Sequence, residues 1–204
     1  MWRTFIALGD SLAEGWGEPA GGERPRSWND WLADGLRAGV PQLRFVNLGW
    51  RGSTVGDVLR DQLPPALGQH PDLVTVTVGA NDALAPTWSA ERFATQLRAV
   101  LEPLAQSGAK VLTFAYPRAA GSGALGSRLP TPPGWDRYAR NLAEVNREVR
   151  RVGADVGAFC LDFEHLAAAG DPENLSADLV HPNARGYLLL GQTALRRLLA
   201  ETAP

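Results

Sequence analysis

Five short apolar runs alternate with longer segments in which apolar residues recur every three or four positions. Such runs are typical of buried strands, and the longer segments are typical of amphipathic helices. The predicted strands cover residues 5–8, 44–48, 73–78, 110–115 and 155–161. Strands that alternate with helices form right-handed βαβ units, which build a parallel sheet with helices on both faces. The alternation therefore predicts an α/β fold.

The segments between the strands carry start and stop signals for helices. Two Ser/Thr-x-x-Asp sequences, Ser27 to Asp30 and Thr54 to Asp57, resemble capping boxes. We expect the helix after Thr54 to stop at Pro64-Pro65. Further helices are expected over residues 89–105, 138–152 and 183–201. The segments expected to be loops are 79–86, 117–134 and 170–182.

The bulk properties of the chain favour one globular domain. Its 204 residues, 45% of them hydrophobic, predict a single domain over residues 1–204. A net charge of -2 gives no electrostatic reason to expect nucleic acid as a partner. No apolar run approaches a membrane span, and the N-terminal run 5–8 is too short for a signal peptide. A cytoplasmic location is expected, and oligomeric state carries no sequence signal.

Three short polar motifs follow the first three predicted strands, at the point where each strand ends. The motifs are Gly9-Asp10-Ser11, Asn47-x-Gly49-x-x-Gly52 and Gly79-x-Asn81-Asp82. In an open parallel sheet the carboxyl ends of all strands lie along one edge, and ligands bind in the crevice there. The topology therefore predicts that Ser11, Gly52 and Asn81 share one cleft.

A serine in such a cleft needs a neighbouring base to become a nucleophile. Three histidines are available. His70 precedes the third strand, on the edge of the sheet away from the cleft, and His165 is typical of a surface histidine. His181 follows Asp178 by three residues in a loop, where the carboxylate can turn onto the imidazole and orient it. Taken alone, Asp-x-x-His is common and is more typical of a structural helix entry.

Taken together, the motifs make the chain resemble the SGNH/GDSL hydrolase family. The matching blocks are Gly9-Asp10-Ser11-Leu12, Asn47-x-Gly49-x-x-Gly52, Gly79-x-Asn81-Asp82 and Asp178-x-x-His181, in the order of that family. The resemblance implies a flavodoxin-like α/β/α sandwich with a five-stranded parallel sheet. It also implies serine-dependent hydrolysis of small carboxylic esters, of short acyl or acetyl groups, with no cofactor and no metal.

The resemblance also implies a role for each matched residue. Ser11 would be the nucleophile, His181 the general base and Asp178 the residue that orients His181. The oxyanion hole would comprise the backbone N–H groups of Ser11 and Gly52 and the side-chain amide of Asn81. Glycine lets its amide approach a ligand closely, and an asparagine amide donates at any pH.

The remaining candidates are weaker. Trp50, Arg51 and Trp88 adjoin the oxyanion motifs and are candidates for substrate contacts, whereas Asp10 and Asp82 are expected to accept hydrogen bonds from loop amides. The alternative to an esterase is a non-catalytic module that binds sugars or acyl chains on tryptophans. The sequence contains no Gly-x-Ser-x-Gly elbow, no dinucleotide fingerprint in the required context and no clustered metal ligands.

Overall fold

The computed structural model describes residues 2–17, 26–118 and 134–202. Its centre is one five-stranded sheet in which all neighbouring strands are parallel, in the order β2-β1-β3-β4-β5. This is the flavodoxin-like order, so the predicted fold class is confirmed. The strands are β1 (Thr4–Gly9), β2 (Arg44–Asn47), β3 (Leu73–Thr77), β4 (Lys110–Ala115) and β5 (Phe159–Asp162).

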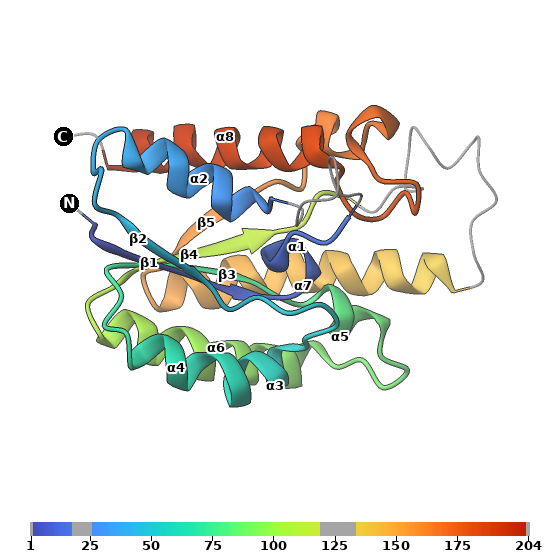
Figure 1. Ribbon diagram of the computed structural model, residues 1–204. Coiled ribbons are helices and arrows are strands. Elements are labelled where there is room, and N and C mark those ends of the chain that lie inside the picture. Colours follow the sequence, from blue (N-terminus) through green and yellow to red (C-terminus); the bar gives the residue numbers. More distant parts are fainter. Residues whose placement is uncertain (1, 18–25, 119–133, 203–204) are drawn as a thin grey trace.

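Helices cover both faces of the sheet, which gives three layers (Figure 1). On one face α2 (Trp28–Arg37) packs along α8 (Ala184–Glu201). On the other face lie α3 (Val55–Asp57), α4 (Leu63–Leu67), α6 (Ala90–Gln106) and α7 (Trp135–Asp155). The short helices α1 (Ser11–Glu14) and α5 (Ala80–Leu84) follow β1 and β3 directly. None of the described helices is long and apolar enough to cross a bilayer.

The predicted helix starts are confirmed where side-chain caps define them. Ser27 and Thr54 each accept from the backbone N–H three residues on, and Asp30 and Asp57 complete the two capping boxes. Asn183 caps α8 in the same way. These contacts lie within one helical turn, and for that reason the sequence pattern alone identifies them.

The prediction that Pro64-Pro65 ends a helix is wrong. Residues 58–62 form one turn of π-helix, in which the Leu63 N–H bonds to the Val58 carbonyl, and α4 then continues through both prolines. A proline ends an α-helix because it lacks an N–H and its ring meets the carbonyl four residues back. The wide π turn ahead of the prolines resets the hydrogen-bond register, so α4 begins as a new helix with proline near its N-terminus, where an N–H is not needed.

Other boundaries also differ from the sequence prediction. The segment 79–86 is not all loop, because α5 occupies its middle. The fifth strand begins at Phe159, since α7 runs on to Asp155 before the chain turns. The loop 170–182 includes a short 3₁₀ turn at Pro172–Asn174. The expected loop 117–134 lies almost entirely outside the described residues.

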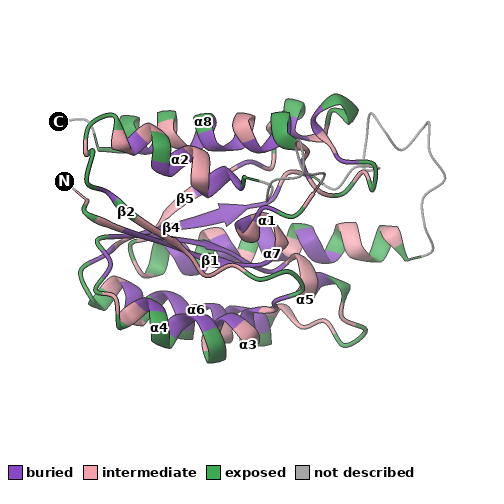
Figure 2. Ribbon diagram, in the orientation of Figure 1, coloured by how far each residue is buried: buried purple, intermediate pink, exposed green. Residues whose placement is uncertain are grey.

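The hydrophobic core fills the space between the sheet and the helix layers. Strands β1, β3 and β4 are buried almost throughout, and the outer sides of the helices are exposed (Figure 2). At the carboxyl end of β1 only glycine fits: Gly9 has φ +139°, and a Cβ there would come within 1.9 Å of the Thr77 carbonyl oxygen. This close approach of two strands fixes where Ser11 leaves the sheet.

Candidate active site

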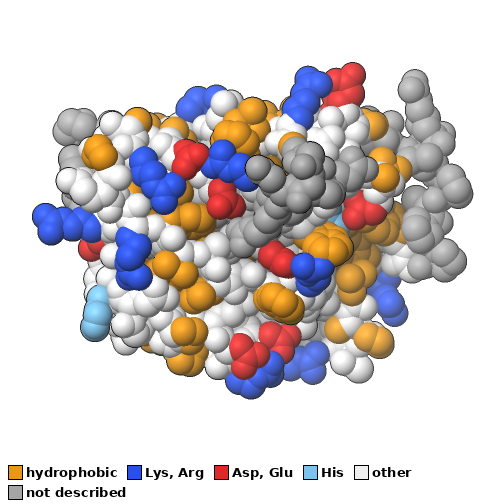
Figure 3. All heavy atoms as spheres, in the orientation of Figure 1, with side chains coloured by type: hydrophobic (Ala, Val, Ile, Leu, Met, Phe, Trp, Pro, Cys, Tyr) orange, Lys and Arg blue, Asp and Glu red, His pale blue; other side chains and the backbone are white. Residues whose placement is uncertain are grey.

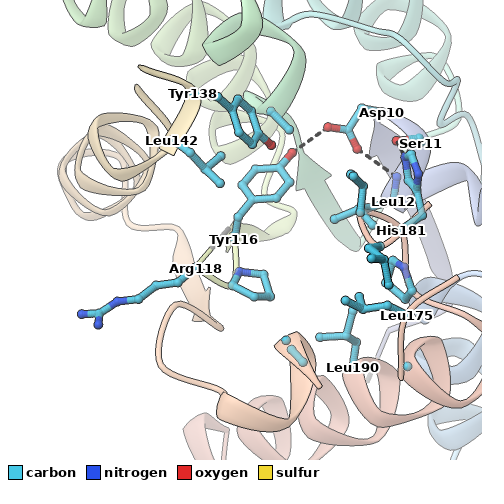
Figure 4. A pocket seen from close by; sticks show the side chains of 18 of the residues that line it. Asp10, Ser11, Leu12, Tyr116, Arg118, Tyr138, Leu142, Leu175, His181 and Leu190 are labelled. Carbon is cyan, nitrogen blue, oxygen red and sulfur yellow. Dashed lines mark hydrogen bonds between the residues drawn. The ribbon is translucent and has the colours of Figure 1, made fainter. Parts of the chain in front are cut away.

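Ser11, His181 and Asp178 form a continuous hydrogen-bonded row. The Ser11 Oγ lies 2.9 Å from His181 Nε2, and His181 Nδ1 lies 2.7 Å from Asp178 Oδ2. The carboxylate favours the tautomer with the proton on Nδ1, which leaves Nε2 to accept from the Ser11 hydroxyl. Figure 4 shows the two side chains next to each other at one end of a pocket. The structure therefore joins residues that are 170 positions apart in the sequence.

The end of β1 and the start of α1 hold Ser11 in place. Gln62, buried in the π turn, accepts from the Gly9 N–H at 2.7 Å and donates to the Gly9 carbonyl at 2.9 Å. Asp10 caps α1 by accepting from the Leu12 N–H. Ser11 is thus the first residue of a short helix, and hydrogen bonds hold the residues immediately before and after it.

A tight turn presents His181 to Ser11. Asp178 Oδ1 accepts from the backbone N–H groups of Val180 and His181, both at 2.9 Å, while Oδ2 accepts from the imidazole. Partial burial opposes the charge of Asp178, but these hydrogen bonds outweigh it and lower the pKa of the carboxyl. Leu179, inside this turn, has φ +56°, which is strained for a residue with a side chain. Leu179 lies between Asp178 and His181 in the sequence, so this strained residue belongs to the turn that brings the two side chains together.

The segments that carry Gly52 and Asn81 are joined by a hydrogen bond. The Asn81 side-chain amide donates to the carbonyl of Ser53, the residue after Gly52, at 3.0 Å. Gly52 has φ +79°, and no atom lies within 4 Å of the position that a Cβ would take. The loop before Gly52 is held at the end of β1, because the Trp50 N–H bonds to the Gly9 carbonyl at 3.0 Å. These bonds connect the Gly52 and Asn81 segments to the end of β1, although neither residue lines the pocket beside Ser11, and the oxyanion hole stays a prediction.

A pocket lies next to Ser11. Its walls are largely apolar and come from α1, α7, α8 and the loop before α8; Leu12, Leu142, Leu175 and Leu190 are among them (Figure 4). Asp10 and Tyr116 lie at its inner side, and the Tyr116 hydroxyl donates to Asp10 Oδ2 at 2.7 Å. Within the described part of the chain, no group of three or more His, Cys, Asp or Glu side chains could hold a metal ion.

Comparison with known proteins identifies the family. The sequence model of the GDSL-like lipase/acylhydrolase family matches residues 7–189, which is most of the chain. The chain belongs to this family. It is accordingly a GDSL-type carboxylic ester hydrolase, as the motifs Gly9 to Leu12 and Asp178 to His181 predicted, and the resemblance drawn from sequence is confirmed.

Two curated relatives of this hydrolase are esterases. An arylesterase of Vibrio mimicus is 37% identical over 83 residues, which cover only 40% of this chain and 39% of the relative. An acetylxylan esterase of Geobacillus stearothermophilus is 26% identical over 96% of this chain and 94% of its own length.

Solved structures of the acetylxylan esterase have the same fold as this hydrolase. One of them superimposes with a TM-score of 0.75 over 96% of this chain and 94% of that chain, at 20% identity. An alpha/beta hydrolase from the metagenome of Lake Arreo, Spain, gives a TM-score of 0.72 over 97% and 94% of the two chains. Three structures of the acetylxylan esterase are of catalytic mutants, in which a serine, a histidine, or an aspartate three positions before that histidine is replaced by alanine.

The structure separates the three predicted substrate contacts of this hydrolase. Trp50 is 65% exposed, and the Arg51 guanidinium, held by Glu14, stacks 3.6 Å from the ring centre of Trp16. Trp88 does not reach the Ser11 pocket. Its indole N–H donates to Glu144 on α7 at 2.7 Å, and it lines a different hollow at the start of α6.

Acidic and basic side chains are interspersed on the face shown in Figure 3, and no continuous basic area of described residues appears there.

The two carboxyl groups near the site, Asp82 and Asp10, accept hydrogen bonds from nearby backbone N–H groups. Asp82 accepts from the Val55 N–H, as expected for a structural carboxylate, and its burial raises its pKa to about 6. Asp10 likewise accepts a loop amide, as expected.

Sequence reasoning missed Tyr116 and Gln62. Tyr116 follows β4 directly, so the rule that located Ser11 and Asn81 at strand ends applies to it equally. Gln62 carried no local signal, because its partner Gly9 is 53 residues away in the sequence.

Proposed function

We propose that this hydrolase is a serine esterase that cleaves short acyl or acetyl esters through an acyl-enzyme on Ser11. The observation that carries the proposal is the row of hydrogen bonds from Ser11 Oγ through His181 to Asp178. The catalytic mutants of the acetylxylan esterase support it, since Asp178 also precedes His181 by three residues. A binding module needs no such row, and family membership leaves that alternative without support.

In the first half of the reaction, Ser11 Oγ attacks the ester carbonyl carbon while its proton passes to His181 Nε2. The carbonyl oxygen becomes an oxyanion, which accepts from the N–H groups of Ser11 and Gly52 and from the Asn81 amide. Collapse of the tetrahedral intermediate breaks the bond to the alcohol oxygen, which takes the proton from His181. The acyl group is then bound to Ser11.

In the second half, water attacks the acyl-enzyme and gives its proton to His181. The second intermediate collapses, Ser11 Oγ regains the proton and the carboxylic acid leaves. Asp178 keeps the imidazole in the required tautomer and stabilises its charged form. The cycle consumes one ester and one water, and Ser11 and His181 return to their starting states.

The test is the Ser11→Ala variant with p-nitrophenyl acetate as substrate. We expect kcat to fall by at least about 10⁴-fold, because no other group can carry the acyl intermediate. Ser107→Ala, at the far end of α6, is the matched control and should turn over normally. Mass spectrometry after a p-nitrophenyl phosphonate should place one adduct on the peptide with Ser11. Undiminished turnover by Ser11→Ala would refute the assignment.

We further propose that Trp50 and Arg51 contact the alcohol part of the ester. Trp50 is 65% exposed and lies two residues before Gly52, so its indole ring is accessible to a substrate. The guanidinium of Arg51 next to it is held in place by a hydrogen bond to Glu14. Trp50→Ala should raise KM for an acetylated sugar several-fold and leave kcat unchanged. Leu84→Ala, an exposed apolar residue on α5, is the control. An unchanged KM for Trp50→Ala would remove this contact.

A further inference from the structure

The carboxylate of Asp10 is buried beside the nucleophile, with only 1% of the residue exposed. Oδ1 accepts from the Leu12 N–H at 3.0 Å, and Oδ2 accepts from the Tyr116 hydroxyl at 2.7 Å. One carboxylate thus joins the first turn of α1 to the end of β4 (Figure 4). The reaction scheme above uses neither Asp10 nor Tyr116, so their arrangement needs another explanation.

The position of Asp10 decides which amide of the first turn remains for the substrate. Its Oδ1 binds the N–H of Leu12 and not the neighbouring N–H of Ser11, which is the proposed oxyanion donor. Tyr116 holds the other oxygen and so fixes the rotation of the carboxylate. A small rotation would change the turn that carries both the Ser11 N–H and its hydroxyl, and misplacements of this kind lower rates strongly.

We propose that Asp10 and Tyr116 are positioning residues of the esterase: the ionised carboxylate, held by the Tyr116 hydroxyl, fixes the turn that carries Ser11. This inference rests on the proposed function and adds to it. The turn loses its support when the carboxylate takes up a proton, so the enzyme needs a charged Asp10 as well as a neutral His181.

The chemistry of the carboxyl group explains this requirement. A carboxylate accepts with both oxygens, whereas a carboxylic acid turns one of them into a donor, so the Tyr116 hydroxyl must change from donor to acceptor to keep this contact. Hydrogen bonds to an ionised acceptor are also about twice as strong as neutral ones. Burial raises the pKa of Asp10 to about 6, although the bonds from Tyr116 and Leu12 oppose the rise. The change of state therefore falls within an accessible pH range.

The groups that face Asp10 come from several elements. They are Tyr116 after β4, Tyr138 on α7, His181 before α8, Tyr187 on α8 and Asp82 on α5. Burial raises the pKa of each tyrosine, so all three stay neutral below pH 9. A charged His181 stabilises ionised Asp10, and Asp82 opposes it. The pKa of Asp82 is also about 6, so Asp82 contributes to the pH dependence of activity in the same range. For this reason each variant's pH profile is compared with that of the wild type.

The experiment measures kcat/KM for p-nitrophenyl acetate from pH 4.5 to 8.5. Asp10→Asn keeps an oxygen that can accept from the Leu12 N–H but carries no charge, so its kcat/KM at pH 8 should lie below that of the wild type. The acid limb of the profile, where kcat/KM falls as the pH is lowered, should reflect the protonation of one group fewer than in the wild type. It should therefore begin at a lower pH. Tyr116→Phe should move the acid limb to higher pH, because Asp10 loses a bond that lowers its pKa. A purely structural role would not move the two limbs in opposite directions.

Tyr138→Phe is the matched control, since it removes a hydroxyl from the same pocket wall and leaves the Asp10 bonds in place; its limb should keep the wild-type shape. Limbs of Asp10→Asn and Tyr116→Phe that superimpose on the wild type would overturn the proposal. If Asp10→Asn does not fold, Tyr116→Phe decides alone. Active Ser11→Ala would refute the proposed function itself, whereas inactive Ser11→Ala with unchanged limbs would refute only the positioning role.

Discussion

Replacing Asp10 by asparagine should make the free energy of unfolding less dependent on pH. The carboxyl is fully buried, and its pKa is raised from 3.8 to about 6 in the folded protein, chiefly by desolvation. In the unfolded chain the same group has its ordinary pKa. The folded protein therefore binds this proton more tightly than the unfolded chain does. This difference decides whether stability rises or falls with pH.

Below pH 3.8 the Asp10 carboxyl is protonated in both states and has no effect on the pH dependence. Between pH 3.8 and about 6 the unfolded chain releases the proton while the folded protein keeps it, so stability falls as pH rises. One proton corresponds to about 1.4 kcal/mol per pH unit, so about 2 units give a loss of about 3 kcal/mol. Above that range the loss is complete and constant.

Asp10→Asn removes this titration, so its stability relative to the wild type should increase by about 2 kcal/mol between pH 4.5 and pH 7. Urea unfolding at several pH values measures the difference directly. Asp57→Asn is the control, because hydrogen bonds from Thr54 lower the pKa of Asp57 to about 2 and its titration is complete below this range. Its stability difference should be constant. A constant difference for Asp10→Asn as well would refute the argument.

Three further predictions test the geometry of the site. Asn81→Ala should lower kcat by about 10²–10³-fold with little change in KM, and an unchanged kcat would remove it from the oxyanion hole. Gly9→Ala should lower the free energy of unfolding by at least about 3 kcal/mol, because its Cβ would overlap the Thr77 carbonyl. Gly52→Ala has free space and should lose only about 1–2 kcal/mol from its positive φ; equal losses for the two glycines, measured in urea, would contradict this. Leu179→Val should lose about 1 kcal/mol, since a β-branched residue fits φ +56° poorly, and its kcat should fall with it; a stable, fully active variant would show that the turn tolerates this strain.

Much of the site could be predicted because its parts follow strand ends. Strand β1 is recognisable from Phe5 to Leu8, and parallel topology then places Ser11, Gly52 and Asn81 on one edge of the sheet. For these three residues, the order of strands and helices along the chain is enough to predict a shared location. The pairing of Ser11 with His181 followed from the scarcity of histidines and from the resemblance to a family.

Other features depended on packing that no local pattern reports. Trp88 lies beside an oxyanion motif in sequence, yet Glu144 on α7 holds its indole away from the pocket. The sequence predicts a helix end at Pro64-Pro65, yet a π turn precedes the prolines and α4 continues through them.

By itself, the sequence determined the alternation of strands and helices, the capped helix starts at Ser27 and Thr54, and the order of the polar motifs. These depend on contacts within one turn of helix or on the handedness of chain connections, both of which act over short stretches. Only the tertiary structure decided that Gln62 closes the end of β1 and that Tyr116 holds Asp10. Those partners are 53 and 106 residues apart, and only the packing of the whole core brings such groups within hydrogen-bonding distance.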